Sequence, residues 1–469
     1  MADLLAILSR GASSLAAQQN AAATASHNLQ NANTPGYARQ RAELAATLPA
    51  EVLGHSWIGR GVDLATVSQA RDRFLESQLP GAQAAKTRAS AESDALASVS
   101  ALDPDAAGGL GAALGAFYSS MRALAQNPGD AGLRQATVGS TRGLALAFNR
   151  TGQALADART GLDAQLDGTL GEANRAAASV AALNRQIRLA RAQGGEPNDL
   201  LDARQKAVDT LAELTGATPI PTGKGDVNLA LAGGATLVNG DNAGTLSTLP
   251  DPANGGHFGV RLAPSDGSPP QVLAATRLGG TAGGLIDARD GALATAANAL
   301  DTLAFDFANQ VNVVHAGGFA LDGTTGQDLF TVSATSTGAA LTLAVDPTVA
   351  GNPAKLAAAG AAGTGAGNSD NLQLLIATES TPLSTGVAAG AALGTITTSF
   401  GNSAARAKAV FEQDAGILDQ LEAMRQSVSG VSIDEEMINL TKYQRGYQAV
   451  LKVITTADEM LGTLMEIKP

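Results

Sequence analysis

The spacing of apolar residues predicts an amphipathic helix near each end of the chain. Residues 4–31 contain no proline, and Leu8, Leu15 and Leu29 fall near one face of a helix that carries Ala and Gln between them. Pro35-Gly36 ends this helix, because proline cannot continue it and glycine permits a turn. An apolar stripe of this kind has to be buried on the other terminal helix or on a neighbouring copy, which points to assembly.

The strongest periodicity of the chain lies near its C-terminus. Apolar residues there alternate in steps of three and four, at Leu440, Tyr443, Tyr447, Val450, Ile454, Ala457, Leu461 and Leu464. A seven-residue repeat of this length is typical of a coiled-coil seam, and the carboxylates Asp434-Glu435-Glu436 suit the first turn of its helix. An ordinary amphipathic helix packed inside one domain is the alternative. The weaker matching stripe on the N-terminal helix favours the seam.

Between these ends the pattern alternates between helix and strand. A short β-like passage lies between residues 52 and 67. Helical spacing follows from residue 72 to 193, with breaks at Pro80-Gly81, Asp103-Pro104 and Asn127-Pro128-Gly129, and another helix begins after Pro197. At Gly216 the period changes to two, and Asn239-Gly240 supplies turn chemistry, so residues 217–280 predict a small β domain.

Helical spacing returns from Leu285 to Val314 and from Leu393 to Met424. The intervening region combines a strand-like stretch at 341–345 with a low-complexity stretch at 357–367, so it is either a second insert or a flexible region. The predicted organisation is an N-terminal helix 1–36 that joins a C-terminal helix 430–469, a helical bundle from 37–215, 283–316 and 391–429, a β-rich insert 216–282, and an uncertain region 317–390.

Composition narrows the class of protein. The chain of 469 residues has a net charge of −12 and no cluster of Lys and Arg, which argues against a nucleic acid or an anionic membrane as partner. It has no cysteine, and no run of 18 or more apolar residues that would span a membrane. The N-terminus also lacks the pattern of a cleaved secretory signal, so export would use an uncleaved N-terminus.

Reactive groups do not converge in the sequence. The four histidines, His27, His55, His257 and His315, are isolated from one another, so neither a metal nor another cofactor is predicted. The Gly-rich stretch 363–367 lacks the lysine of a phosphate loop, and the acidic turn 322–328 is not a complete calcium loop. We therefore predict a protein that is not an enzyme.

Residues 29–37 form a motif, Leu29-Gln30-Asn31-Ala32-Asn33-Thr34-Pro35-Gly36-Tyr37. This stretch resembles the signature shared by flagellar rod, hook and hook-associated axial proteins. Further stretches resemble the hook–filament junction members of that family, in the same order along the chain: Tyr37-Ala38-Arg39-Gln40, Trp57-Ile58-Gly59-Arg60-Gly61-Val62, Asn127-Pro128-Gly129-Asp130, Pro197-Asn198-Asp199-Leu200-Leu201-Asp202 and Ser429-Gly430-Val431-Ser432-Ile433-Asp434-Glu435-Glu436. The region 317–390 matches the family least.

The resemblance implies a mainly α fold with inserted β. The terminal helices would form a coiled-coil-like inner layer, surrounded by a long helical bundle domain and a small β-rich outer domain. It also implies export by the flagellar type III apparatus and an extracellular position between hook and filament. The implied partners are further copies of the chain in a ring or tube, the flagellar hook protein, the second hook–filament junction protein, and an export chaperone, for which the exposed apolar C-terminal helix is our candidate site.

Residue roles follow from these expectations. The assembly interface is predicted at Leu8, Leu15, Leu29, Leu440, Tyr443, Tyr447, Val450, Ile454, Leu461 and Leu464, and a hinge at Pro35, Gly36 and Tyr37. The nearest alternative is the hook protein or another axial rod protein, from which the helical block 105–215 would be absent. A peptidoglycan-hydrolysing enzyme and a secreted adhesin are the alternatives from other classes. The first would need convergent carboxylates, and the second would not need the Pro-Gly-Tyr signature.

Overall fold

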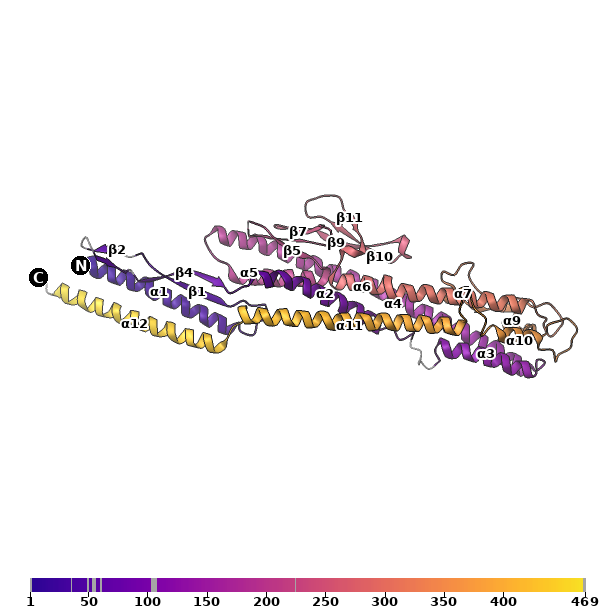
Figure 1. Cartoon of the computed structure of the whole chain (residues 1–469). Coiled ribbons are helices and arrows are strands. Elements are labelled where there is room, and N and C mark those ends of the chain that lie inside the picture. Colours follow the sequence, from indigo (N-terminus) through magenta and orange to yellow (C-terminus); the bar gives the residue numbers. More distant parts are fainter. Residues whose placement is uncertain are drawn as a thin grey trace.

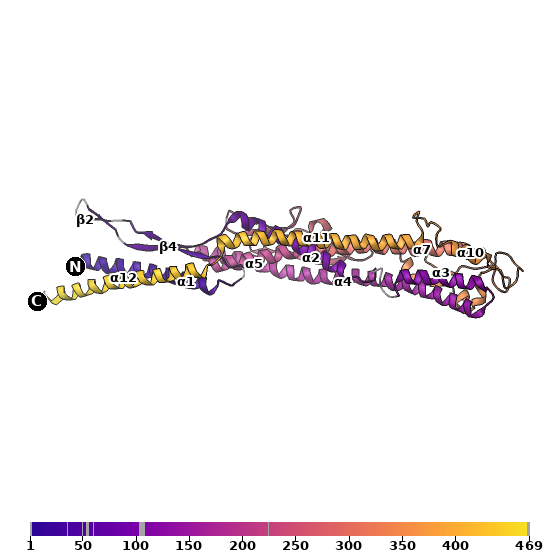
Figure 2. The same cartoon turned by 60° about the horizontal axis from the view of Figure 1, so that its bottom comes forward.

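The structure, a computed structural model, is a long rod (Figure 1). It describes residues 2–34, 36–48, 50–52, 56–59, 61–102, 108–223 and 225–466. The two terminal helices lie together at one end, long helices run from there to the opposite tip, and small sheets lie along one side (Figures 1 and 2). The predicted mainly α fold with inserted β is confirmed.

The end that holds both termini consists of two helices and a β ribbon. Helices α1 (Ala2–Gln30) and α12 (Ile433–Glu466) pack against each other. Strands β1 (Gln40–Ala46) and β4 (Val62–Gln69) pair antiparallel and lie along α1, while β2 (Ala50–Val52) and β3 (Ser56–Ile58) pair beyond them. The ribbon is tied to α1 where the Val62 N–H donates to Ser14 Oγ at 3.2 Å.

The helical domain is a row of helices that run along the rod (Figure 1). From one side to the other, α4 contacts α5 and α6, these contact α2, and α2 contacts α11. Helix α3 packs on α4 near the far tip, and α7 continues from α6 through a wide π-helical turn. The helices are α2 (Arg73–Ala97), α3 (Leu110–Gln126), α4 (Ala131–Ala192), α5 (Asn198–Thr215), α6 (Gly280–Asp287), the π turn (Ala288–Leu293), α7 (Ala294–Ala316) and α11 (Ala389–Ser429).

One predicted helix break is wrong and another lies outside the described residues. Helix α2 runs through Pro80-Gly81, with Pro80 inside it. Leu79 packs on Leu418 and Leu421 of α11, and this burial outweighs the single backbone hydrogen bond that Pro80 cannot donate. Asp103-Pro104 falls within 103–107, outside the described residues. The turn at Asn127-Pro128-Gly129 is present, between α3 and α4.

Small residues let the helices approach closely, and aromatic residues fill the far half of the core. A Cβ on Gly284 of α6 would lie 2.1 Å from the backbone oxygen of Arg88 on α2, so these two backbones touch where the helices cross. Phe117 and Phe307 pack edge to face with ring centroids 5.6 Å apart. Tyr118, Phe148 and Phe330 complete this cluster. The far half therefore contains the best-filled part of the core.

The predicted β-rich insert is two small antiparallel sheets seated on α4. Amide side chains of α4 bind the sheet backbones. Asn184 Nδ2 donates to the Val227 and Gly240 oxygens, and Asn174 exchanges two hydrogen bonds with Leu246. The strands are β5 (Thr218–Pro221), β6 (Val227–Ala230), β7 (Thr236–Asn239) and β8 (Asn242–Ala243) in one sheet, and β9 (Thr245–Pro250), β10 (Phe258–Ala263) and β11 (Gln271–Leu273) in the other.

The region 317–390 covers the far tip of the bundle. The strand expected at 341–345 is mostly wrong, because Asp301 accepts from the Gly338 and Ala340 N–H groups and starts a short helix there. Leu343, Val349 and Leu356 are buried in the main core, so the region packs as part of the bundle. Its elements are β12 (Phe330–Thr331), α8 (Ala339–Thr342), β13 (Ala344–Val345), α9 (Pro347–Gly351) and α10 (Asp370–Ala377).

Candidate functional site

The contact between α1 and α12 joins small residues on one helix to bulky residues on the other. Ala17, Ala21 and Ala25 are the buried residues in the middle of α1. A Cβ on Gly11 would lie 2.6 Å from Ile454 Cγ1, so α12 approaches here as closely as a glycine allows. The bulky residues of α12 therefore supply most of the apolar area, and the small residues of α1 set the short distance between the helices.

The predicted seam of α12 lies on the side that meets α1 of the same chain. Its members from Leu440 to Leu461 are half-buried, and Ala457 among them is buried. Leu464 lies in the helix, and its side chain is outside the described residues. On α1, Leu8, Leu15 and Leu29 are half-buried beside the alanine face. The two helices that carry the predicted residues thus pack together in one chain, and the role of these residues between chains stays a prediction.

Other large apolar side chains remain exposed on the paired helices. Ile438, Val453 and Met460 share a flank of α12, at helical spacings from one another, and are more than half exposed. Leu5 of α1 is also exposed. An open groove of about 440 Å³ is lined by Ile7, Lys452, Val453, Thr456, Ala457 and Met460. The helix pair therefore leaves an apolar surface uncovered.

Asn28 is the centre of the joint where the helix pair meets the rest of the chain. Its Nδ2 donates to the Gln40 backbone oxygen at 2.7 Å and to Glu436 Oε2 at 3.2 Å. Its Oδ1 accepts from the Gln40 N–H at 2.9 Å and from Tyr37 Oη at 2.7 Å. The side chain is 1% exposed, so an unpaired amide here would be costly. One buried amide thus ties α1, β1 and α12 together.

One of the predicted hinge residues, Tyr37, contacts this amide directly. Gly36 has a φ of +82°, which a residue with a side chain rarely adopts, and Pro35 lies outside the described residues. Since Tyr37 donates to Asn28, its hydroxyl accepts from His27 Nδ1 at 3.1 Å. Burial and the nearby carboxylates of Asp202 and Asp199 raise the pKa of Tyr37, so it stays a neutral donor. These contacts fix the turn in one conformation within the chain.

Arg39 connects α12 to two other parts of the joint, the end of α11 and the residue that follows β4. Its Nε donates to Glu436 Oε1 and its guanidinium to Glu435 Oε2, each at 2.7 Å. Its backbone N–H donates to the Ser429 oxygen at 3.0 Å, while its own oxygen accepts from the Ala70 N–H at 2.8 Å. The carboxylates predicted for the first turn of this helix therefore also bind a cation from the other end of the chain.

A second layer of carboxylates lies between the joint and the bundle. Arg71 binds Glu76 at 2.9 Å and also binds Asp202. Burial raises the pKa of Glu76 and of Asp202, although Arg71 opposes this in both. Burial raises the pKa of Asp209 to about 6, against the effect of Gln205 and Arg425. Asp209 therefore makes this layer sensitive to pH near 6.

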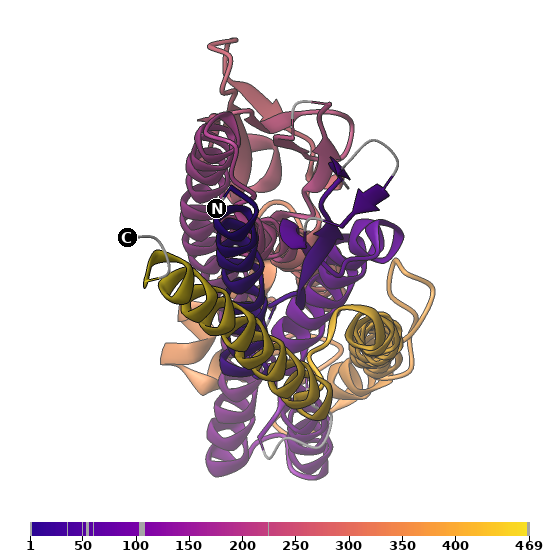
Figure 3. The same cartoon turned by 90° about the vertical axis from the view of Figure 1, so that its left-hand side faces the viewer.

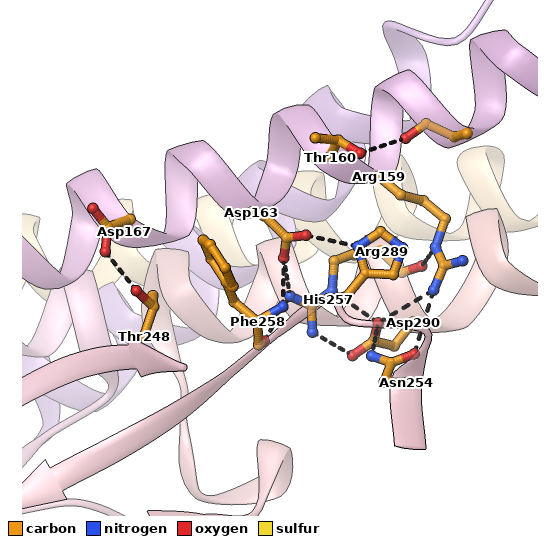
Figure 4. Close-up of polar contacts among 11 residues, drawn as sticks. Arg159, Thr160, Asp163, Asp167, Thr248, Asn254, His257, Phe258, Arg289 and Asp290 are labelled. Atoms are coloured by element: carbon orange, nitrogen blue, oxygen red, sulfur yellow. Dashed lines mark hydrogen bonds and ion pairs between the residues drawn. The ribbon is translucent and has the colours of Figure 1, made fainter. Parts of the chain in front are cut away.

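A histidine does meet a carboxylate elsewhere in the fold. His257 Nδ1 lies 2.6 Å from Asp163 Oδ2 on α4, and Asp163 also binds Arg289 from the π turn and the Phe258 N–H (Figure 4). Burial alone would raise the pKa of Asp163, but these hydrogen bonds hold it below its usual value. Arg289 is 3% exposed and in turn pairs with Asp290. The cluster joins the β insert to the bundle, since its members come from both.

The remaining candidate motifs have structural partners. Arg134 borders the Gly-rich stretch 363–367, but its guanidinium donates to the Pro128 and Leu356 backbone oxygens. Asp322 of the acidic turn pairs with Lys355 at 2.7 Å. Among the described residues, no group of three or more His, Cys, Asp or Glu side chains is placed to hold a metal ion. Within the same residues, every helix is too short or too polar to cross a membrane.

The joint at Asn28 was not predicted as a site from the sequence, although its residues lie in or beside the stretches that carry the resemblance. Asn28 directly precedes the N-terminal motif, and Arg39 and Glu436 belong to two other stretches that carry the resemblance. Neither hydrophobic spacing nor local chemistry links residues about 400 positions apart. The detectable signal was that polar residues with no local role lie at the ends of both terminal helices.

Comparisons with known proteins match this chain to flagellar proteins. A model of the flagellar hook-associated protein FlgK helical domain matches residues 96–330, and a model of the flagellar basal body rod FlgEFG protein C-terminal region matches residues 425–467. The chain is 28% identical over 554 residues to flagellar hook-associated protein 1 of Salmonella typhimurium, with 98% of this chain and 100% of the relative covered.

Other relatives carry the same name. Flagellar hook-associated protein 1 of Escherichia coli is 26% identical over 547 residues, with 98% of this chain and 100% of the relative covered, and that of Bacillus subtilis is 27% identical over 493 residues, with 96% of each covered. The fold is similar to the flagellar hook junction protein FlgK from Burkholderia pseudomallei. The TM-score is 0.69 at 18% identity, over 75% of this chain and 100% of that one.

Proposed function

This chain belongs to the flagellar hook-associated protein FlgK family, and from that membership we propose how its terminal helices hold it in the bacterial flagellum. Members of the family are structural proteins of the junction between hook and filament, and this chain is such a component. It assembles with components of the hook and the filament. The long helix α4 lies within the helical block 105–215, which a hook protein would be expected to lack. Its presence therefore argues against the hook-protein alternative.

The proposed mechanism is assembly through the paired terminal helices. Each subunit presents α1 and α12 as one unit, and neighbouring copies cover the apolar surface that the pair leaves exposed. The observation that supports this most directly is the groove at Ile7, Val453 and Met460, because an apolar groove on a soluble surface marks an interaction site. The predicted residues from Leu8 to Leu29 and from Leu440 to Leu464 hold the pair together and border that surface.

The partners follow from this arrangement. Copies of the chain form a ring, with the flagellar hook protein on one side and the second hook–filament junction protein on the other. Before assembly the subunit is exported through the flagellar type III apparatus, with a chaperone covering α12, because an exposed apolar helix promotes aggregation. In the exported monomer the terminal helices are held together only weakly, and neighbouring copies that bury their exposed side stabilise them and offset the entropy cost of ordering.

A paired substitution tests the assembly surface. Val453→Glu combined with Met460→Glu places two charges in the groove without touching the predicted seam. In cells that lack the native protein, we expect the variant to reach the medium but not the hook tip, and electron microscopy to show hooks without filaments. Gln448→Glu combined with Thr455→Glu adds the same charge at other exposed positions of α12 and should support filaments. Normal filaments from the first variant would overturn the proposal.

A further inference from the structure

Helix α11 carries a second exposed apolar row, separate from the terminal helices. Val410, Ile417, Met424 and Val428 follow one another at spacings of seven, seven and four, and each is between 39% and 48% exposed. Gln413 and Gln420 lie beside them, and the half-exposed Asp414, four residues after Val410 and three before Ile417, places one carboxylate within this row. The other exposed side of α11 carries Lys408, Glu412, Asp419 and Glu422. A seven-residue repeat on one flank is the pattern of a helix that packs against another helix.

The opposite side of the molecule exposes a row with the same repeat. Along α4, exposed or half-exposed residues follow in steps of four and three at Gly168, Glu172, Arg175, Ser179, Ala182, Gln186 and Leu189. Three of these seven residues, Gly168, Ser179 and Ala182, are small. A Cβ on Gly168 would have open space around it, so the backbone is accessible there. At these three positions the row offers space for the bulky side chains of α11.

Charge is complementary between the two helices. The α11 segment 410–428 contains Glu412, Asp414, Asp419 and Glu422 against one basic residue, Arg425. The α4 segment 168–189 contains Arg175, Arg185 and Arg188 against one acidic residue, Glu172. Arg188 is bound to Asp226 and Asp241 of its own chain, and Arg175, whose side chain is 75% exposed, lies 3.9 Å from Glu172 of the same helix. The α11 segment is therefore apolar and acidic, and the α4 segment on the other side of the bundle is basic.

The two rows cannot meet within one chain. Helices α5, α6 and α2 lie between α4 and α11, and in the view along the rod the gold α11 and the purple-to-magenta α4 lie on opposite sides (Figure 3). An interface between two different patches of the same protein closes into a ring when a constant rotation relates the copies. Opposite edges with matching repeats and opposite charge are suited to such a contact.

We propose that the flank of α11 that carries Val410, Ile417, Met424 and Val428 packs on the exposed row of α4 in a second copy of this chain. Ile417 and Met424 insert at the small residues Gly168 and Ser179, and Arg175 approaches Asp414. This inference rests on the proposed ring and adds a lateral contact in the helical domain to the one made by the terminal helices.

Cysteine cross-linking tests the contact, because the chain contains no native cysteine. Ile417→Cys is combined in turn with Gly168→Cys, Glu172→Cys, Arg175→Cys and Ser179→Cys, and hook–filament particles are isolated and oxidised. A disulfide needs Cα atoms within about 7 Å, so we expect at least one pair to give a ladder of cross-linked multimers on a non-reducing gel. Glu412→Cys, on the charged side of α11, replaces Ile417→Cys in the control series and should give monomers.

The outcomes separate the two proposals. If the cysteine variants are present in the particles but no pair with Ile417→Cys cross-links, the lateral contact is wrong and the proposed ring is untouched. A ladder from the Glu412→Cys series alone would also overturn the contact, because it assigns the wrong flank. If the protein with no substitution is absent from the hook–filament boundary in the same preparations, the proposed function itself fails. A ladder with Ile417→Cys alone supports the contact.

Discussion

Asn28 and Glu436, 408 positions apart in the chain, are joined by a hydrogen bond of 3.2 Å from Nδ2 to Oε2. The same amide satisfies both backbone groups of Gln40, so it joins the end of α1, the start of β1 and the first turn of α12. Because three segments are held by one buried side chain, removing that side chain should loosen all three together.

Asn28→Ala should loosen the joint. The substitution leaves the Gln40 N–H and oxygen without their partner in a buried place, which costs about 2–3 kcal/mol in the free energy of unfolding. Hydrogen exchange at the Gln40 amide should accelerate, and α12 should become sensitive to proteolysis. Gln30→Ala changes an exposed residue two positions later and should alter neither. Unchanged exchange at Gln40 would mean that another group holds β1 in place.

Gly11→Val should separate the terminal helices. The new side chain would occupy the space of Ile454 Cγ1, which lies 2.6 Å from the ideal Cβ, and overpacking of this kind costs about 1–3 kcal/mol. We expect a lower melting temperature for the terminal helices by circular dichroism. Gly462→Val makes the same change where a Cβ has open space and should be neutral or stabilising. Equal melting temperatures of the Gly11→Val and Gly462→Val variants would contradict the close approach of α1 and α12.

Asp209→Asn should stabilise the protein at neutral pH. The pKa of this carboxyl is raised to about 6, so the folded protein binds its proton more tightly than the unfolded chain does. Its contribution to stability is present in acid and lost as pH rises through about 6. The neutral amide removes the cost of the buried charge, for a gain of roughly 1–3 kcal/mol at pH 7.5 that fades toward pH 4. Denaturant unfolding at both pH values measures it.

Asp419→Asn is the control for that series, since Asp419 lies on the exposed side of α11. It should leave the unfolding midpoint unchanged at either pH. A destabilised Asp209→Asn at pH 7.5 would show that the carboxylate is charged and bound in the folded protein.

His315 should make the far tip less stable in acid, which is the opposite pH dependence to that of Asp209. Burial lowers its pKa, and its neutral ring donates from Nδ1 to the Gln327 oxygen and accepts at Nε2 from the Ala357 N–H at 3.0 Å. Because the folded pKa lies below the unfolded value of about 6.5, this contribution is present above that pH and is lost as pH falls. After correction for intrinsic rates, the Ala357 amide should exchange faster at pH 5 than at pH 7.5, with Val260 as the reference. Equal protection would exclude the ring as its acceptor.

Asp163→Ala should release the β insert from α4. The change leaves Arg289 buried without its carboxylate and removes the partner of the Phe258 N–H, a loss of about 3–5 kcal/mol for a buried pair. Exchange at β10 should increase while the aromatic cluster stays protected. Asp167→Ala, one turn along α4, removes only an exposed hydrogen bond to Thr248 and should have a small effect (Figure 4). Similar losses of stability from Asp163→Ala and Asp167→Ala would show that the buried cluster is not the main contact between the β insert and α4.

The elements that the sequence predicted best are those with long repeats. The helix from Leu440 to Leu464 and the alternation around Val227 to Leu231 need only local spacing, and both elements are present. Local rules failed where tertiary contacts decide. Pro80 is held in a helix by its neighbours, and residues 341–342 are helical because Asp301 binds the Gly338 and Ala340 N–H groups at the start of α8. The joint at Asn28 was beyond local rules, since its partners are far away in sequence.

The joint also has a mechanical consequence. The chain crosses from the terminal helices to the bundle twice, near Ala70 and near Gly430, and Arg39 is hydrogen-bonded to both crossings through its backbone. A single covalent strand would let one part swivel freely about the other. Two crossings fastened side by side resist swivelling, while they still permit bending about the line through them. The two parts of the subunit are therefore held more firmly against twisting than against bending.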